Sequence, residues 1–152
     1  MREDASTKHI SIEREFHARQ SGLNVDPARF QQVIWNLLRN AVKFTPAGGR
    51  ILIRTRDDEE SRLEIEVADS GIGIEKESFE KIFLPFEQVI SHGKHHFGGI
   101  GLGLAIARAI VDLHHGSIKA SSAGPNQGRR LRLNCRAPPF RRTALLIPQS
   151  IC

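Results

Sequence analysis

Residues 26–45, DPARFQQVIWNLLRNAVKFT, carry the strongest structural signal in the chain. Apolar residues recur there at the three- and four-residue spacing that puts side chains on one face of a helix. Asp26 suits the N-cap, and Pro27 suits the first helical position, where an N–H would have no partner anyway. Pro46 predicts the end of the helix, because proline cannot continue it and restricts the residue before it. The predicted buried stripe consists of Phe30, Val33, Ile34, Leu37, Leu38 and Ala41.

A polar row lies beside this apolar stripe. Asn36, Asn40 and Lys43 are four and three residues apart, so they share one helix face. Mg²⁺ prefers oxygen ligands and is usually held by few protein groups together with substrate phosphates. The row therefore suits a magnesium–nucleotide complex. In the alternative interpretation, the two asparagines bond to neighbouring backbone and Lys43 is a solvated lysine.

The composition predicts one domain with a hydrophobic core. The chain has 152 residues, of which 39% are hydrophobic. No apolar run is long enough to cross a bilayer, and the N-terminus has no apolar signal segment, so we expect a cytoplasmic protein that reaches a membrane only through segments absent from this sequence. Cys135 and Cys152 form neither a disulfide framework nor a metal-binding spacing.

The net charge of +5 does not predict nucleic-acid binding. Residues 129–152 hold six of the 22 basic residues and no acid, which leaves 16 basic against 17 acidic residues in 1–128. A folded nucleic-acid binder presents a basic face, whereas this excess lies in a terminal segment. We expect no nucleic-acid partner.

Three segments alternate with the period of a β-strand. Ile10 and Ile12 predict an edge strand within residues 7–16, and residues 50–56 and 62–68 predict a hairpin around an acidic tip. One face of the resulting sheet should pack on the helix.

The sequence DSGIGI, residues 69–74, follows the second hairpin strand. Asp69 at the end of a buried strand can accept a hydrogen bond from an exocyclic amine, and Gly71 and Gly73 allow a flat ring to approach the backbone. This pattern suits a purine pocket. A simple Asp-Ser-Gly turn is the alternative.

The segment after this loop predicts a short helix at residues 75–82, a mobile loop at 89–99, and a glycine-rich entry into a helix that ends near Gly116. Backbone N–H groups at a glycine-rich helix start can bind phosphate. His92, His95 and His96 do not predict a zinc site, because both cysteines lie far away in the C-terminal segment. The expected apolar face of the last helix is Leu102, Ala105, Ile106, Ala109, Ile110 and Leu113.

Four stretches in one order, NLLRNAVKFTP, DSGIGI, FLPFEQ and GGIGLGLAIARAIV, resemble the N, first-glycine, F and second-glycine boxes of the catalytic ATP-binding domain of hybrid-type sensor histidine kinases. The resemblance implies the Bergerat fold, an α/β (α+β) two-layer sandwich. In it, a mixed sheet of about five strands is covered on one face by about three helices, with an ATP lid between the last two boxes.

The resemblance also implies a role for each matching residue. Asn40 would bind Mg²⁺, with Asn36 beside the metal and phosphates and Lys43 on the phosphates. Phe44 would lie against adenine and Asp69 would bind its amino group. The remaining nucleotide-binding residues would be Gly71 and Gly73 at the base, and Lys94, Gly99, Gly101, Leu102 and Gly103 at the triphosphate.

Position 36 favours a kinase over a hydrolase. Members that resemble the gyrase, chaperone and mismatch-repair ATPases place a glutamate four residues before the metal-binding asparagine, where it activates water. Asn36 occupies that position here. Bound ATP is then better suited to phosphorylate an external nucleophile, with positioning and charge neutralisation supplying the catalysis.

The resemblance implies two partners. None of the seven histidines has the sequence setting of a phosphoacceptor, so the chain would phosphorylate a histidine on a separate or missing dimerisation domain, from which a response regulator receiver domain would be phosphorylated. One alternative is a truncated, non-catalytic nucleotide-binding module, and another is a related serine kinase of the anti-sigma type.

The C-terminus departs from the family. We divide the chain into a catalytic domain at 1–128 and an atypical basic tail at 129–152, where the family instead closes with a strand resembling G-A-T-F-T-V-x-L-P. One permitted codon set for residues 129–136 reads, one base earlier, as Ala-Thr-Leu-Thr-Val-Glu-Leu-Pro, which is that strand. We therefore hypothesise a frameshift near Gly128, which the nucleotide sequence would test. In the alternative, a genuine variant tail pairs as an edge strand through Leu131 and Leu133.

Overall fold

The computed structural model describes residues 2–19, 25–59, 62–87 and 100–135. The helices and strands follow one another as α1 (Arg2–Thr7), β1 (Ser11–Phe16), α2 (Pro27–Phe44), β2 (Arg50–Asp57), β3 (Leu63–Asp69), the 3₁₀ turns η1 (Lys76–Ser78) and η2 (Lys81–Phe83), α3 (Gly103–Leu113), β4 (Ser117–Ser121) and β5 (Arg129–Cys135).

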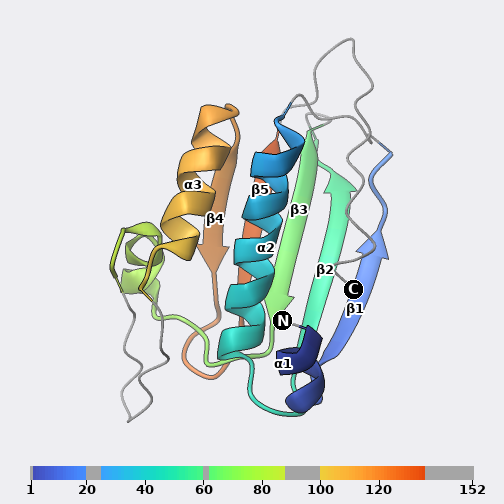
Figure 1. The fold of residues 1–152 in the computed structure, drawn as a ribbon, viewed down its shortest axis with the longest axis vertical. Helices are drawn as coiled ribbons and strands as arrows, with labels where there is room; N and C mark the ends of the chain where they lie inside the picture. Colours follow the sequence, from blue (N-terminus) through green and yellow to red (C-terminus); the bar gives the residue numbers. More distant parts are fainter. Residues whose placement is uncertain (1, 20–24, 60–61, 88–99, 136–152) are drawn as a thin grey trace.

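The strands form one mixed sheet in the order β1-β2-β3-β5-β4. β1 runs parallel to β2, and the remaining neighbours are antiparallel. Helices α2 and α3 lie side by side across one face of the sheet, and α1 lies near the lower end of α2 (Figure 1). This arrangement confirms the predicted two-layer α/β sandwich with a five-stranded mixed sheet. No helix in the described ranges is long and apolar enough to cross a membrane.

Helix α2 has the limits and the buried face that the sequence predicts. The Asp26 carboxylate accepts hydrogen bonds from the backbone N–H groups of Ala28 at 2.9 Å and Arg29 at 3.1 Å, as an N-cap does. The helix ends at Thr45, whose hydroxyl donates to the Ala41 carbonyl at 2.7 Å. All six residues of the predicted apolar stripe are buried.

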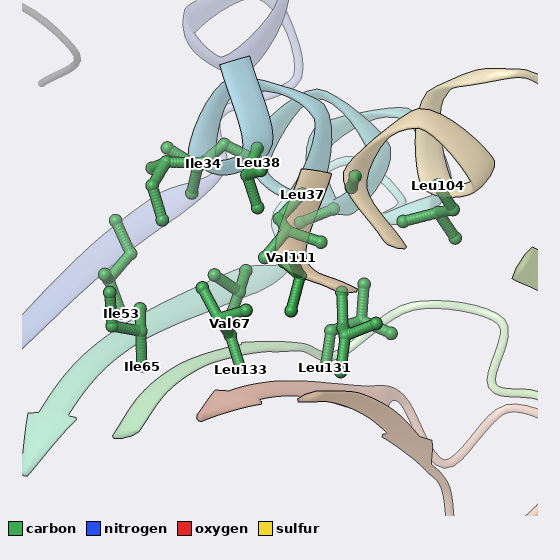
Figure 2. Close-up of a cluster of buried hydrophobic side chains, with 14 of the residues drawn as sticks. Ile34, Leu37, Leu38, Ile53, Ile65, Val67, Leu104, Val111, Leu131 and Leu133 are labelled. Atoms are coloured by element: carbon green, nitrogen blue, oxygen red, sulfur yellow. The ribbon is translucent and has the colours of Figure 1, made fainter. Parts of the chain in front are cut away.

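The core lies between α2, α3 and the sheet face beneath them. Figure 2 shows Leu37 and Leu38 of α2 pointing toward Val67 of β3 and Leu133 of β5. Alternate residues of β5 are buried, from Arg129 to Cys135. Burial raises the pKa of the Cys135 thiol to about 12.

Helix α3 buries a face that differs from the predicted one. Ile106 is 37% exposed and Leu113 is 77% exposed, although both belong to the predicted stripe. The helix is apolar over most of its circumference, so its sequence allows several stripes, and packing against α2 and the sheet selects one. The buried residues are Leu104, Ala107, Ile110 and Val111.

The end of α3 also differs in detail from the predicted glycine cap. His115 adopts the left-handed conformation, with φ 56°, and its N–H donates to Asp112, while the Gly116 N–H donates to Val111. This is the Schellman pattern, in which the left-handed position is usually glycine. A Cβ on Gly116 would lie 2.7 Å from the Asn134 carbonyl, so glycine is needed for the close approach to β5.

Two segments deviate from the predicted secondary structure, and a third cannot be compared with it. The edge strand predicted at 7–16 begins only at Ser11, after a short helix that the sequence did not indicate. The helix predicted at 75–82 is a pair of 3₁₀ turns. The loop at 89–99 lies outside the described residues.

The segment after Gly128 forms a central strand. β5 pairs with β3 on one side and β4 on the other, so it is neither lost nor at an edge of the sheet. Leu131 and Leu133 are fully buried on its inner face. Strand formation therefore extends past the boundary placed at residue 128.

Candidate functional site

Asp69 is buried at the end of β3, and both its carboxylate oxygens are engaged. Oδ1 accepts the Gly71 N–H at 3.0 Å, and Oδ2 accepts Nε of Arg129 at 2.7 Å. Asp69 as a whole residue is 7% exposed. Burial raises the pKa of Asp69 above its usual value, and this effect outweighs the Arg129 charge and the two hydrogen bonds, which act to lower it.

Gly71 joins this strand end to the end of α2. A Cβ at Gly71 would collide with the Phe44 carbonyl oxygen, and the Ile72 N–H donates to that same oxygen at 3.4 Å. Only glycine allows the two segments to approach this closely. Phe44 and Asp69 are therefore brought together, as the predicted purine pocket requires.

Gly73 contacts a second loop. It has φ 71°, and a Cβ there would collide with the Gly124 carbonyl oxygen. The Asn126 N–H donates to the Ile72 carbonyl at 2.7 Å. Gly73 thus holds the loop between β4 and β5 against the segment after Asp69.

Asn36 lies next to the start of α3. A Cβ built on Gly103 would lie 3.7 Å from Asn36 Oδ1. The Asn36 Nδ2 group is buried without a hydrogen-bond partner among the described residues. A buried donor without a partner is costly, and a phosphate oxygen would satisfy it. This orphaned donor at a glycine-rich helix start fits the phosphates of a nucleotide.

A backbone hydrogen bond joins the residues before α3 to the segment that ends at residue 87. Gly101 has φ 75°, and its carbonyl accepts the Phe86 N–H at 3.2 Å. Leu102 occupies the N-cap position of α3 without a side-chain cap. Lys94 and Gly99, also predicted to contact the triphosphate, lie outside the described residues.

Lys43 is half-buried on α2 and has no acidic partner within the described part of the chain. Its ammonium nitrogen is 4.7 Å from the centroid of the Phe44 ring. Burial lowers the pKa of Lys43, and the charges of Arg129 and Arg39 lower it further. A cation in this setting would gain from a phosphate counter-charge.

Asn40 contributes a backbone contact that the sequence did not indicate. Its carbonyl oxygen accepts the Nη2 group of Arg129 at 2.6 Å, while its side chain is half-buried on the same helix face as Asn36. The described ranges hold no group of three or more His, Cys, Asp or Glu side chains that could bind a metal ion. A carboxamide oxygen such as that of Asn40, together with substrate phosphates, is a ligand set that suits Mg²⁺.

Arg129 is the site residue that sequence reasoning missed. The sequence places it in the basic tail, yet its Cζ lies 4.3 Å from the centroid of the Phe44 ring. The available signal was the alternation of Arg129, Leu131 and Leu133, which puts an arginine on the same strand face as two core leucines.

Comparison with curated proteins finds sensor kinases. The chain is 44% identical over 105 residues to the autoinducer 2 sensor kinase/phosphatase LuxQ of Vibrio vulnificus strain CMCP6, covering 66% of this chain and 12% of the relative. It is 41% identical over 114 residues to the aerobic respiration control sensor protein ArcB of Escherichia coli K12, covering 74% of this chain and 14% of the relative. The chain thus spans under a fifth of the length of these relatives.

Comparison with solved structures finds the same fold. The catalytic domain of histidine kinase ThkA has a TM-score of 0.75 and 29% identity, covering 91% of this chain and 87% of that one. Full-length ShkA in complex with AMPPNP has a TM-score of 0.74 and 27% identity, covering 91% of this chain and 29% of that one. A family profile matches residues 25–139, which is most of the chain. The chain therefore belongs to the histidine kinase-, DNA gyrase B- and HSP90-like ATPase family and has the fold of a histidine kinase catalytic domain.

Proposed function

We propose that this chain binds Mg-ATP and transfers the γ-phosphoryl group to a histidine on a separate acceptor domain, as the catalytic half of a two-component sensor kinase. The supporting observation is the position of α2, which meets the Asp69 strand end at Phe44 and the glycine start of α3 at Asn36. One helix therefore reaches both a base-binding carboxylate and a phosphate-binding helix start.

Three residues of α2 would have different roles in nucleotide binding. Asn36 Nδ2 would donate to a phosphate oxygen, Lys43 would supply positive charge, and Asn40 would provide a metal ligand. Bound Mg²⁺ would neutralise phosphate charge. With asparagine at position 36 in place of a glutamate base, water is poorly activated and transfer to an external nucleophile is favoured.

The partners follow from the same proposal. The acceptor would be a dimerisation domain that carries the phosphorylated histidine, and the next partner would be a response regulator. One solved relative, ThkA, was determined in complex with the response regulator protein TrrA. We place this activity in the cytoplasm, where ATP is available.

Binding is tested by calorimetry with AMPPNP, with and without Mg²⁺, up to millimolar ligand. We expect Lys43→Met to weaken binding and Lys119→Met, a change at an exposed lysine of β4, to leave it unchanged. Asn40→Asp should alter the dependence on Mg²⁺. Binding and Mg²⁺ dependence that both Lys43→Met and Asn40→Asp leave unchanged would contradict the proposed site.

Transfer is tested by adding a purified acceptor domain and γ-labelled ATP. We expect an acid-labile, base-stable phosphoryl group on the acceptor, as phosphohistidine is. A phosphoserine product would instead support the anti-sigma type of kinase. Binding without transfer to any acceptor would support the non-catalytic nucleotide-binding module.

A further inference from the structure

Arg129 is a buried arginine inside the proposed base-binding site. Its side chain is 5% exposed and pairs with the Asp69 side chain, which is 2% exposed. The two residues are direct partners across the β3–β5 ladder. Because alternate residues of a strand face opposite sides of the sheet, the position of Arg129 on β5 fixes it on the helix-covered side with Leu131 and Leu133.

The partners of Arg129 are those that a purine would use. Asp69 Oδ2 accepts its Nε–H at 2.7 Å, where an exocyclic amine would donate. The Phe44 ring lies 4.3 Å from its Cζ, where a flat base would stack. A guanidinium is planar, carries N–H donors along its edge and packs on aromatic faces. It therefore reproduces both contacts that a base would make.

Other arginines of β5 do not share this environment. Arg132 pairs with Glu66 at 2.7 Å and stays 40% exposed, and Arg130 is exposed. Of the three arginines of β5, only Arg129 faces α2. Its Nε–H bonds to Asp69 Oδ2, the carboxylate oxygen to which the Gly71 N–H does not bond. Its contacts thus belong to the site and not to the general charge of the segment.

We infer that Arg129 occupies the base subsite as an internal competitor, so that a purine nucleotide binds only when the guanidinium leaves Asp69 and Phe44. This inference rests on the proposed function and concerns regulation of the same site. Only the fraction of molecules with Arg129 displaced is competent, and the apparent affinity for the nucleotide falls by that fraction.

The test compares Arg129→Ala with a matched control, Arg130→Ala, an exposed neighbour on the opposite face of the same strand. Calorimetry measures the Kd of three probes: Mg-AMPPNP, adenosine and tripolyphosphate. We expect Arg129→Ala to tighten binding of Mg-AMPPNP and adenosine by about ten- to a hundredfold, the range for removing one competing charged hydrogen bond. Tripolyphosphate should bind no more tightly, since Arg129 competes with the base. Arg130→Ala should bind all three like the wild type.

Two failures are distinguishable. If the wild type binds Mg-AMPPNP and Arg129→Ala binds it no better, the inference is wrong and the proposed function stands. If none of the folded chains binds nucleotide, the proposed function fails and the inference fails with it.

A measurement on the unaltered chain covers the case in which Arg129→Ala does not fold. The Nε–H of Arg129 should give a protected side-chain NMR signal, because it is buried and bonded to Asp69. Saturating Mg-AMPPNP should shift that signal and expose it to exchange with solvent. A signal that stays unchanged at saturation would show that nucleotide does not displace Arg129 and would overturn the inference.

Discussion

At the scale of single residues, the site depends on charges that are removed from water. Asp69 and Arg129 are each almost fully buried, and each is the main compensation for the other's lost hydration. Such pairs contribute little net stability as a unit, but removal of one partner leaves an unpaired buried charge. The carboxylate of Asp69 is therefore both a candidate ligand group and a structural requirement.

Asp69→Ala measures the cost of an unpaired buried charge. It leaves the buried Arg129 guanidinium without its carboxylate partner and removes the acceptor of the Gly71 N–H. We expect the free energy of unfolding to fall by about 3–5 kcal/mol, measured by chemical denaturation. The control is Glu15→Ala, because Glu15 pairs with Arg54 at 2.7 Å but is 40% exposed, where solvent screens the attraction. Equal losses in the two variants would contradict a special role for the buried pair.

Lys43 is expected to be more reactive than an ordinary lysine. Its pKa is lowered by burial and by neighbouring cations, so a larger fraction of the amine is neutral at a given pH. Acetylation followed by mass spectrometry should therefore modify Lys43 at a lower pH than a free lysine side chain. Added Mg-AMPPNP should suppress the reaction, because phosphate favours the charged form.

The lowered pKa of Lys43 predicts how the stability of the fold depends on pH. Since folding lowers the pKa of Lys43, its charged form destabilises the fold at neutral pH, and this penalty disappears as the pH rises through the folded and then the unfolded pKa. Lys43→Met should consequently not reduce stability at neutral pH. Loss of nucleotide binding in that variant would then report on the site and not on unfolding.

At the scale of elements, α2 is capped at its C-terminus by a distant lysine. The Lys8 ammonium donates to the carbonyls of Val42, Lys43 and Thr45 at 2.9, 3.0 and 3.1 Å. The last carbonyls of a helix lack intrahelical partners, and positive charge is favourable there. Lys8 thus fixes the end of the helix that carries Lys43 and Phe44.

Replacement of this cap by Lys8→Met should lower the free energy of unfolding by about 1–3 kcal/mol, the range for loss of hydrogen bonds to a charged group. Thermal and chemical denaturation would both measure it. Lys76→Met, at an exposed position of η1, is the matched control and should behave like the wild type. A Lys8→Met chain as stable as this control would show that water replaces the cap without loss.

At the scale of the whole molecule, β5 holds the sheet together. It lies between β3 and β4, so its removal separates β4 from the other strands. It also supplies Leu131 and Leu133 to the core beneath the helices. Residues 129–135, which depart from the sequence expected for the family, are thus structural.

A chain that stops at residue 128 should therefore fail to fold cooperatively. Loss of a central strand exposes the edges of both neighbours and removes buried leucines, which a small domain cannot offset. Far-UV circular dichroism with thermal unfolding would measure this. A cooperative transition at the full-length midpoint would instead support residue 128 as the domain boundary.

Local patterns in the sequence were sufficient for the parts whose neighbours are close in the chain. The period of residues 26–45, the N-cap at Asp26 and the proline at position 46 predicted α2 and its buried face, and alternation predicted the β2–β3 hairpin. The grouping of Phe44 with Asp69, and of Asn36 with Gly103, also agrees with the resemblance to a known family. Whether these residues bind Mg-ATP stays a prediction, as does the frameshift.

Tertiary structure alone decided the features that depend on contacts between distant segments. The sequence of α3 is apolar on several sides, so only packing could select its buried face. Lys8 reaches α2 across 34 to 37 residues of chain, and Arg129 reaches Asp69 across 60. The sequence by itself determined α2, the β2–β3 hairpin and the family, because periodicity and motifs are local. The position of an arginine in the proposed base-binding site followed only from placing β5 at the centre of the sheet, because strand order depends on long-range pairing that no local pattern encodes.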